Sequence, residues 1–361
     1  CHGKIRSAMG IADDFLKGNV NSDAFKPGGG KGGQLMAFSK CKRFIVKEMD
    51  KGDHQSLLSV SDAYRDHVLG GPSLLCLYLL HYRDVATGKI FIVMANSCAR
   101  TPLPGFENGM QYDSVYDLKG CADDKTLKDM GKSIEPVHKR VWQVHMWMGK
   151  VAWSETRKNY YKGKVEARNM KRNIPGDLQH DLEKVVTRDV TEFLIPCELM
   201  DYSLLLGIRT IDLNAGGDDV DAPSMGEIVK IQQNSPLLSL ANWQYPFIWT
   251  KGAELPGDKP TQIKVMAMGI IDLLQDWNKA KELAMFIKIA ERNKATIPPK
   301  DYGERFVEQF RERCRPNQDQ VLEYKLPEFR DLLQEAEELP LMGDGNDVFY
   351  SARSEIGDSF I

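Results

Sequence analysis

Short apolar runs separated by turn residues dominate the first hundred residues of the chain. Leu35–Phe38 and Arg43–Met49 flank a polar turn, and this pattern predicts a hairpin of two strands. Leu74–Tyr82 and Lys89–Ala95 are joined by a turn that contains Thr and Gly, and they predict a second hairpin. Residues 90–94 are apolar on both faces of the predicted strand, which is typical of a central strand in a sheet.

Helical periodicity governs much of the remaining chain. We predict one short helix within residues 1–27 and further helices over 53–68, Leu182–Leu194, 276–290, Tyr302–Arg313 and Leu326–Glu338. The residues of 53–68 that we expect to be buried are Leu57, Leu58, Val60 and Tyr64. Val265–Asp272 predicts a strand. Residues 210–261 are rich in Gly, Asp, Pro and Asn, with one apolar stretch near Trp249, and they predict a long, partly disordered insertion.

Composition adds only broad limits. The chain has 361 residues, of which 42% are hydrophobic and 27% charged, as in an ordinary globular protein. This length favours one large bilobal unit or two domains. No apolar run approaches the roughly 20 residues of a membrane span. Seven cysteines without a CxxC pair indicate reduced intracellular thiols rather than disulfides or zinc ligands. The start at Cys1 shows neither an initiator methionine nor a secretory pattern, so we expect a longer parent chain.

Charge is distributed unevenly along the chain. Residues 119–172 carry 14 lysines and arginines against six acidic residues, although the net charge of the whole chain is −3. Three tryptophans, Trp142, Trp147 and Trp153, lie in this basic stretch. A basic segment in an acidic protein indicates a face for an anionic partner, with a solvated loop that binds no partner as the alternative.

A glycine-rich segment precedes the first predicted hairpin. Residues 28–33 contain five glycines in six positions, and consecutive backbone N–H groups in such loops can bind phosphate oxygens. Lys47 follows in the second strand, on the same face as Ile45 because side chains alternate along a strand. A lysine among apolar residues needs an anion, which could be the carboxylate of Asp53 or Glu48, or a ligand phosphate. A flexible linker and an exposed edge-strand lysine remain the alternatives.

Two isolated acids complete the chemically informative set. Asp201 leads the apolar run Tyr202–Leu206, and Asp272 closes the run Val265–Ile271. Each could simply cap a helix. The order of a glycine loop, a strand lysine and two separated acids is, however, what phosphoryl transfer from a nucleotide requires, because that chemistry is largely electrostatic.

Four segments resemble the signature segments of phosphatidylinositol phosphate kinases. They are Tyr116-Asp-Leu-Lys-Gly120, Met200-Asp-Tyr-Ser-Leu-Leu-Leu-Gly-Ile208, Gly269-Ile-Ile-Asp-Leu-Leu-Gln275 and Tyr302-Gly-Glu-Arg-Phe306. Arg43–Lys47 resembles the nucleotide-lysine strand of that family, and Gly30-Lys-Gly-Gly33 its glycine loop. The resemblance extends from about residue 20 to about residue 315.

The resemblance implies an α+β fold with two lobes, distantly like that of protein kinases, built from antiparallel sheets with flanking helices. We expect an N-terminal lobe over residues 1–96 and a C-terminal lobe over 97–361. The resemblance also implies ATP and Mg²⁺. Carried over by motif, Lys47 would hold the nucleotide phosphates together with Gly30, Lys31, Gly32 and Gly33. Asp272 would bind the metal, Asp201 would lie beside the acceptor hydroxyl, Lys119 would add a cation, and Met94–Asn96 would meet adenine by position.

The same resemblance implies a lipid substrate. We expect an ATP-dependent kinase that converts phosphatidylinositol 4-phosphate to the 4,5-bisphosphate, located in the cytoplasm and peripherally at the cytosolic face of anionic membranes. A homodimer is an open alternative, and no nucleic-acid partner is expected. The segment after Asp272 corresponds to the specificity loop of the family, so the lipid would meet Lys279, Lys281, Ala284 and Lys288.

Some positions depart from the family pattern. Ala284 stands where glutamate is typical of enzymes that make the 5-phosphate and alanine of those that make the 4-phosphate, which favours the alternative of a phosphatidylinositol 5-phosphate 4-kinase. Glu282 replaces the second lysine of a usual pair, and Asp53 stands where a longer glutamate could pair with Lys47. A phosphoinositide-binding pseudokinase or scaffold is the second alternative, but the presence of Lys47, Asp201 and Asp272 together favours the enzyme.

Overall fold

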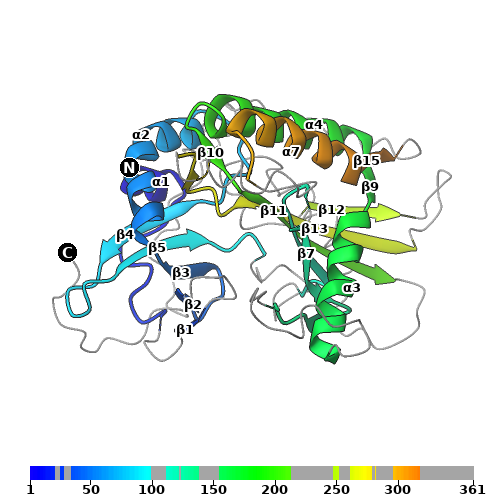
Figure 1. Cartoon of the computed structure of the whole chain (residues 1–361), viewed down its shortest axis with the longest axis horizontal. Helices are drawn as coiled ribbons and strands as arrows, with labels where there is room; N and C mark the ends of the chain where they lie inside the picture. Colours follow the sequence, from blue (N-terminus) through cyan, green and yellow to red (C-terminus); the bar gives the residue numbers. More distant parts are fainter. Residues whose placement is uncertain are drawn as a thin grey trace, which may run out of the picture.

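The computed structural model describes residues 1–20, 25–27, 34–98, 111–121, 123–137, 154–212, 247–251, 261–278, 281 and 296–317. Within these residues helices combine with sheets that are almost entirely antiparallel, which agrees with the predicted α+β class. Figure 1 shows a five-stranded sheet on the left and a six-stranded sheet on the right. These two sheets carry the residues of interest.

The five-stranded sheet has the order β1-β2-β3-β5-β4. Its strands are β1 (Lys26–Pro27), β2 (Leu35–Phe38), β3 (Phe44–Glu48), β4 (Tyr78–Arg83) and β5 (Ile90–Ala95). Both predicted hairpins are therefore confirmed, and β5 lies between β3 and β4 as a central strand should. Along β3, Phe44 and Val46 are buried whereas Ile45 and Lys47 are only half-buried, so Lys47 projects from the face opposite the core.

The six-stranded sheet has the order β12-β13-β11-β6-β7-β8. Its strands are β6 (Ser114–Leu118), β7 (Lys125–Asp129), β8 (Lys132–Ser133), β11 (Ser203–Asp212), β12 (Phe247–Lys251) and β13 (Gln262–Ile271). β11 and β13 pair along their whole length, from Ser203 opposite Ile271 to Asp212 opposite Gln262. Two small sheets pair β10 (Leu199–Met200) with β14 (Gln275–Asp276), and β9 (Arg172–Pro175) with β15 (Cys314–Asn317).

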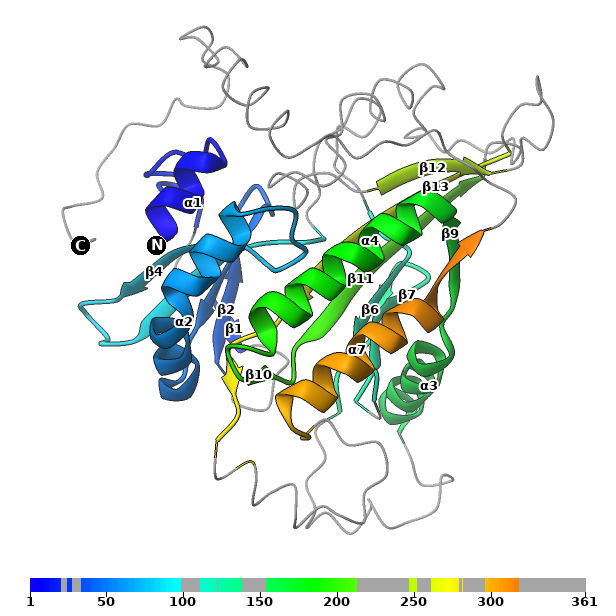
Figure 2. The ribbon, with the colours of Figure 1, turned by 90° about the horizontal axis from the view of Figure 1, so that it is seen from above.

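Helices cover the sheets. They are α1 (His2–Ala8), α2 (Lys51–Leu69), α3 (Glu155–Asn169), α4 (Gly176–Arg188) and α7 (Pro299–Arg313), and α4 continues into the π-helix η4 (Asp189–Leu194). Figures 1 and 2 both show α4 and α7 side by side along one flank of the molecule. α3 packs against β7, and α1 packs against β4 and α2.

Three predictions need correction. Leu58 is 57% exposed, because it lies off the stripe of Leu57, Val60 and Tyr64 that α2 buries. Part of the predicted insertion is the strand β12, whose Phe247 and Trp249 are buried. Asp276 belongs to β14 rather than to the start of a helix. The rest of the predicted helix 276–290 falls mainly outside the described residues, as do the helix 326–338 and the three tryptophans of the basic stretch.

Backbone contacts tie the two sheets together through the segment between α2 and β4. The Ile270 N–H in β13 donates to the Leu74 carbonyl at 2.6 Å, and the Cys76 N–H donates to the Ile270 carbonyl at 2.8 Å. The buried Asp189 carboxylate accepts from the Leu74 N–H at 2.7 Å and pairs with His67 of α2 at 2.7 Å. These contacts fix the position of α2 and its sheet relative to the end of β13.

Gly269 explains how closely the connection after β5 approaches β13. A Cβ atom at Gly269 would lie 2.2 Å from the Ser97 hydroxyl oxygen, so only glycine admits the passing chain there. After β5, the chain therefore passes in direct contact with β13 of the six-stranded sheet.

The described residues contain neither a disulfide bond nor a membrane-spanning helix. All seven cysteines lie within the described residues, and each is a free thiol. Among the helices that the structure describes, none is both long and apolar enough to cross a bilayer.

Candidate active site

Both predicted acids lie at the same bend between two sheets. Asp201 connects β10 to β11, and Asp272 connects β13 to β14. Because β11 pairs with β13 and β10 pairs with β14, the two acids lie in adjacent connections where the chain leaves the six-stranded sheet. Asp201 has φ of 62° and Asp272 has φ of 55°, in the left-handed region that non-glycine residues rarely adopt. Such strain concentrates at functional sites.

Lys119 reaches the same bend from the neighbouring strand. Leu118 ends β6 opposite Leu204 at the start of β11, so Lys119 follows close to the connection that contains Asp201. The Lys119 Nζ donates to the Asp201 Oδ1 at 2.6 Å and to the Asp201 carbonyl at 2.7 Å. This lysine thereby holds both the carboxylate and the strained backbone of Asp201.

Lys47 joins the site from the other sheet. Its Nζ donates to Asp272 Oδ1 at 2.9 Å, although the two residues are 225 positions apart. Burial alone would lower the pKa of Lys47, but the charge and hydrogen bond of Asp272, together with the charge of Asp53, raise it. The ammonium is therefore permanently charged at neutral pH. Glu48, one of the partners expected from the sequence, pairs with Lys89 at 3.0 Å instead.

The electrostatics keep Asp272 ionised. Burial alone would raise the pKa of its carboxyl, but Lys47, through its charge and hydrogen bond, and the charges of Lys119 and Lys125 lower it below the ordinary value. Asp53, in the first turn of α2, shows the opposite balance. Burial, followed by the charge of Asp50, raises the pKa of Asp53 to about 6, even though Lys47 lowers it.

Lys125 is a neighbour that sequence reasoning missed. It stands directly opposite Asp117 in the β6–β7 pair, and its Nζ lies 2.8 Å from Asp117 Oδ2. Its charge also helps to lower the pKa of Asp272, so it belongs to the same electrostatic environment. The alternation of charged residues in the two strands could have indicated this pair, but only with the register known.

Lys281 is the part of the predicted lipid-binding segment that the structure describes. Its pKa is lowered, first by burial and then by Lys119, while Asp276, Asp201 and Asp53 act to raise it. Lys281 therefore lies within electrostatic reach of the bend. Lys279, Ala284 and Lys288 fall outside the described residues, as do Gly30, Lys31, Gly32 and Gly33.

Met94 and Asn96 lie at the end of β5. Met94 is opposite Ile45 and Lys47 is opposite Ile92, so Met94 and Lys47 project from the same face of the sheet. The Asn96 side chain donates to the Lys42 carbonyl at 2.8 Å and accepts from the Cys98 N–H at 3.1 Å. These contacts hold the turn before β3 against the chain that crosses to the second sheet.

A magnesium ion is compatible with this arrangement. Mg²⁺ at nucleotide sites uses one or two carboxylates and completes its octahedron with water and phosphate oxygens. The Asp272 side chain is 50% exposed and ionised, so it can contribute such an oxygen. Among the described residues no group of three His, Cys, Asp or Glu side chains could hold a metal without such help. The donor set therefore fits a metal that arrives with a nucleotide.

Comparison with known proteins defines the class. Residues 23–313 match the family model described as Phosphatidylinositol-4-phosphate 5-Kinase. The chain therefore belongs to the phosphatidylinositol phosphate kinase family, whose members are phosphoinositide kinases, as the sequence motifs predicted.

The relatives of this chain include both 5-phosphate 4-kinases and 4-phosphate 5-kinases. The chain is 25% identical to phosphatidylinositol 5-phosphate 4-kinase type-2 gamma of Danio rerio, over 84% of this chain and 73% of that protein. It is 23% identical to the type-2 beta enzyme of Homo sapiens, with the same coverage. It is also 23% identical to phosphatidylinositol 4-phosphate 5-kinase 3 of Arabidopsis thaliana, over 77% of this chain and 38% of that protein.

Proposed function

We propose that this chain transfers the γ-phosphate of ATP to a ring hydroxyl of a phosphatidylinositol monophosphate, converting phosphatidylinositol 4-phosphate to the 4,5-bisphosphate. One observation carries the proposal: the ion pairs Lys47–Asp272 and Lys119–Asp201 converge on one bend from four separate strand ends. Phosphoryl transfer needs positioned cations for the phosphates and carboxylates for the metal and the acceptor. The description of the matching family supports the choice of substrate.

Each residue then has a defined task. Lys47 releases Asp272 in part and binds the phosphate oxygens, since its ammonium is charged and its side chain is 28% exposed. Asp272 would hold Mg²⁺, and the ion would supply positive charge to the nucleotide phosphates. Asp201 accepts a hydrogen bond from the attacking hydroxyl and orients it, with Lys119 holding that carboxylate in place. Lys119 also offers a cation to the charge that develops on the transferred group.

The nucleotide is proposed to lie against the face of the five-stranded sheet that carries Lys47. Lys47 and Met94 share that face, and Met94 lies toward the end where the chain crosses to the second sheet. We propose that residues 1–96 form the N-terminal lobe of a protein-kinase-like bilobal fold and 97–361 the C-terminal lobe. Gly30–Gly33 would cover the phosphates, and the Met94–Asn96 connection would contact adenine.

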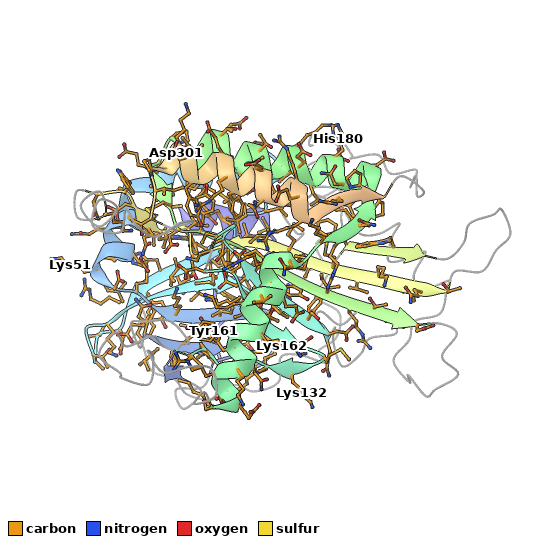
Figure 3. All side chains as sticks on the ribbon, turned by 45° about the vertical axis from the view of Figure 1, so that its right-hand side comes forward. Lys51, Lys132, Tyr161, Lys162, His180 and Asp301 are labelled. Carbon is orange, nitrogen blue, oxygen red and sulfur yellow. The ribbon has the colours of Figure 1, made fainter. Side chains whose placement is uncertain are left out.

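We further propose that the enzyme works peripherally at the cytosolic, anionic surface of membranes. Exposed basic residues on and after α3 support this view: Lys158, Lys162, Arg168 and Lys171. Figure 3 shows Lys162 on α3 with Lys132 nearby in the view, well away from His180 and Asp301 on the α4–α7 flank. Each basic residue near an anionic leaflet contributes about 1 kcal/mol. Four of them would supply roughly 4 kcal/mol, which is close to a thousandfold in partitioning.

A second candidate is the reciprocal reaction, phosphorylation of phosphatidylinositol 5-phosphate at the 4-hydroxyl. Ala284 favours it, because alanine there resembles the enzymes that make the 4-phosphate. The similarity to the type-2 gamma enzyme of Danio rerio and the type-2 beta enzyme of Homo sapiens, both named as 5-phosphate 4-kinases, also favours it.

A substrate panel separates these possibilities. The chain would be incubated with ATP, Mg²⁺ and vesicles that carry one phosphatidylinositol monophosphate each, and the position of the new phosphate would be determined. The proposal predicts the 4,5-bisphosphate from the 4-phosphate. The same product from the 5-phosphate alone would establish the second candidate, and lipid binding without any product would indicate a pseudokinase.

A further inference from the structure

Asp124, in the connection between β6 and β7, anchors the loop that carries Lys119. Its side chain is 1% exposed. The Oδ1 atom accepts hydrogen bonds from the backbone N–H groups of Lys119 at 2.6 Å, Gly120 at 2.9 Å and Cys121 at 3.4 Å. Consecutive N–H groups that converge on one acceptor form a concave anion site. Here the anion is part of the chain, so the carboxylate fixes the conformation of the loop.

The second oxygen of Asp124 is held by helix α7. Arg313 donates from Nη2 to Asp124 Oδ2, and from Nη1 to the Ala167 carbonyl at 2.7 Å. Both charged side chains are almost completely buried, at 5% and 1% exposure. Removing one partner of such a pair leaves an uncompensated buried charge. Arg313 therefore gives the Asp124 carboxylate a single defined position.

The loop also rests directly on α7. Gly120 has φ of 69°, and a Cβ atom there would lie 2.7 Å from Cγ of Gln309. Gln309 accepts a hydrogen bond from Arg313 through its Oε1 atom, at 3.4 Å. The helix thus supports the loop by contact at Gly120 and by charge at Asp124.

The other end of α7 supports the partner of Lys119. The Tyr302 hydroxyl donates to the carbonyl of Tyr202, the residue after Asp201. Both tyrosine side chains are buried, and their rings meet edge to face at 4.8 Å between centroids. One helix therefore holds the backbone on both sides of the Lys119–Asp201 pair.

We propose that Asp124, held by Arg313, is a positioning residue for phosphoryl transfer: it sets the loop 119–121 so that the Lys119 ammonium meets Asp201. The proposal rests on the proposed function. Misplacement of a reacting group by about 1 Å can cost on the order of 100-fold in rate. Loosening the loop should therefore lower turnover, while the binding of lipid vesicles, which depends on other surfaces, should remain.

The chemistry of an amide makes Asp124→Asn a sharp test. The side chain of asparagine has one oxygen, which can accept hydrogen bonds either from the loop N–H groups or from the Arg313 guanidinium. Its NH₂ group then faces the remaining set of donors and cannot accept from them. In the double variant Asp124→Asn with Arg313→Gln, the glutamine carbonyl can accept from the asparagine NH₂ group. That pair replaces the lost contact without any charge, so it should restore part of the anchoring.

Two measurements on the full chain decide the proposal. Amide hydrogen exchange at residues 119–121 reports the anchoring of the loop without any need for activity. Steady-state kinetics with ATP and phosphatidylinositol 4-phosphate vesicles, or 5-phosphate vesicles if that is the substrate, reports its effect on kcat and KM. The matched control is Arg311→Gln, which removes a pair between the same helix and Glu183 of α4 at 2.6 Å without contact with the loop.

We expect Asp124→Asn to accelerate exchange at 119–121 and to lower kcat by about 10- to 100-fold with little change in the KM for vesicles. The double variant should recover part of the slow exchange at 119–121 and part of kcat. Arg311→Gln should change neither the exchange nor kcat. If Asp124→Asn fails to fold, Arg313→Lys, which keeps the charge but loses the second donor, carries the same test.

Each contrary result has its own meaning. Unchanged exchange, or faster exchange with unchanged kcat, overturns the positioning role alone, because the wild type remains active. A wild type that phosphorylates none of the phosphatidylinositol monophosphates refutes the proposed function, and the positioning role fails with it.

Discussion

Lys47 and Asp272 form an ion pair 2.9 Å long. It joins β3 of the five-stranded sheet to the connection that follows β13 of the six-stranded sheet. The Lys119–Asp201 pair, 2.6 Å long, lies in the neighbouring connection, between β10 and β11. Two cations and two carboxylates therefore meet where strands from both sheets end. The motifs share a site because the backbone bridge between Leu74 and Ile270 holds the sheets together.

Replacing Lys47 by methionine should lower ATP-dependent turnover by about 100-fold or more, because a positioned cation stabilises the charge that develops on the transferred phosphoryl group. The free energy of unfolding should change by about 1 kcal/mol or less, since the pair is partly exposed. Lys89→Met is the matched control, as it removes a lysine that pairs with Glu48 in the same sheet. Equal kinetics of the two variants would remove Lys47 from the site.

Asp272→Asn should abolish measurable turnover and leave binding to anionic vesicles nearly intact. The amide keeps the shape of the side chain but loses the charge that pairs with Lys47 and that, under the proposed function, would hold Mg²⁺. Turnover and vesicle sedimentation would be measured together, with Asp62→Asn, from an exposed pair with Arg65, as the control. Residual activity equal to the wild type would mean that Asp272 does not hold the metal.

Reversing the charges of Lys158, Lys162 and Lys171 should weaken binding to anionic vesicles, and most strongly at low salt, because salt screens exposed charges. Arg157 and Lys164 are excluded from the set because they are buried and their loss would disturb packing. Vesicle partitioning across a salt series makes the measurement.

A variant with Lys184→Glu and Lys300→Glu carries two reversals on the α4–α7 flank, where both side chains are exposed, and its loss of binding is compared per reversed charge. We expect its binding to fall less than that of the α3 variant. Equal losses would indicate a general charge effect, and an unchanged salt dependence in the α3 variant would mean that α3 does not contact lipid.

Asp53 should make stability depend on pH. Because burial raises its pKa in the folded state to about 6, the folded protein holds a proton there that the unfolded chain loses near pH 4. This group's contribution is therefore fully present below pH 4 and is lost as the pH rises through 6. Asp53→Asn should be more stable than the wild type at pH 7.5 by about 1–2 kcal/mol, less than the full shift because solvent screens the side chain. The free energies of unfolding of the wild type and Asp53→Asn should converge near pH 4. Urea unfolding at several pH values makes the measurement, and a difference that does not change with pH would contradict this view.

Local pattern predicted much of the fold. The hairpins β2–β3 and β4–β5, the strand β13 and the helices α2 and α7 follow from periodicities of two and 3.6 residues. The failures have physical reasons. Leu58 lies one residue off the buried stripe of α2, and β12 gains its place by pairing with the distant β13. Glycine and proline around β12 concealed the alternation of its buried Phe247 and Trp249.

The sequence also predicted some features of the candidate site and not others. Motifs identified Lys47, Lys119, Asp201 and Asp272, because each is an isolated charge within an apolar or turn segment. Their pairing was not predictable, since it depends on two strand registers and a contact across 225 residues. Sequence suggested Asp53 or Glu48 for Lys47, and the structure gives Asp272. Asp124 escaped notice because nothing in its local sequence distinguishes it from a surface loop acid.

Transfer of labelled γ-phosphate from ATP to phosphatidylinositol 4-phosphate vesicles, compared between the wild type and Asp201→Asn, tests the central claim most directly. We predict labelled 4,5-bisphosphate from the wild type and a loss of about 100-fold or more in the variant, with ATP binding retained. Wild-type protein that binds the vesicles but labels no lipid, or a variant as active as the wild type, would contradict the account.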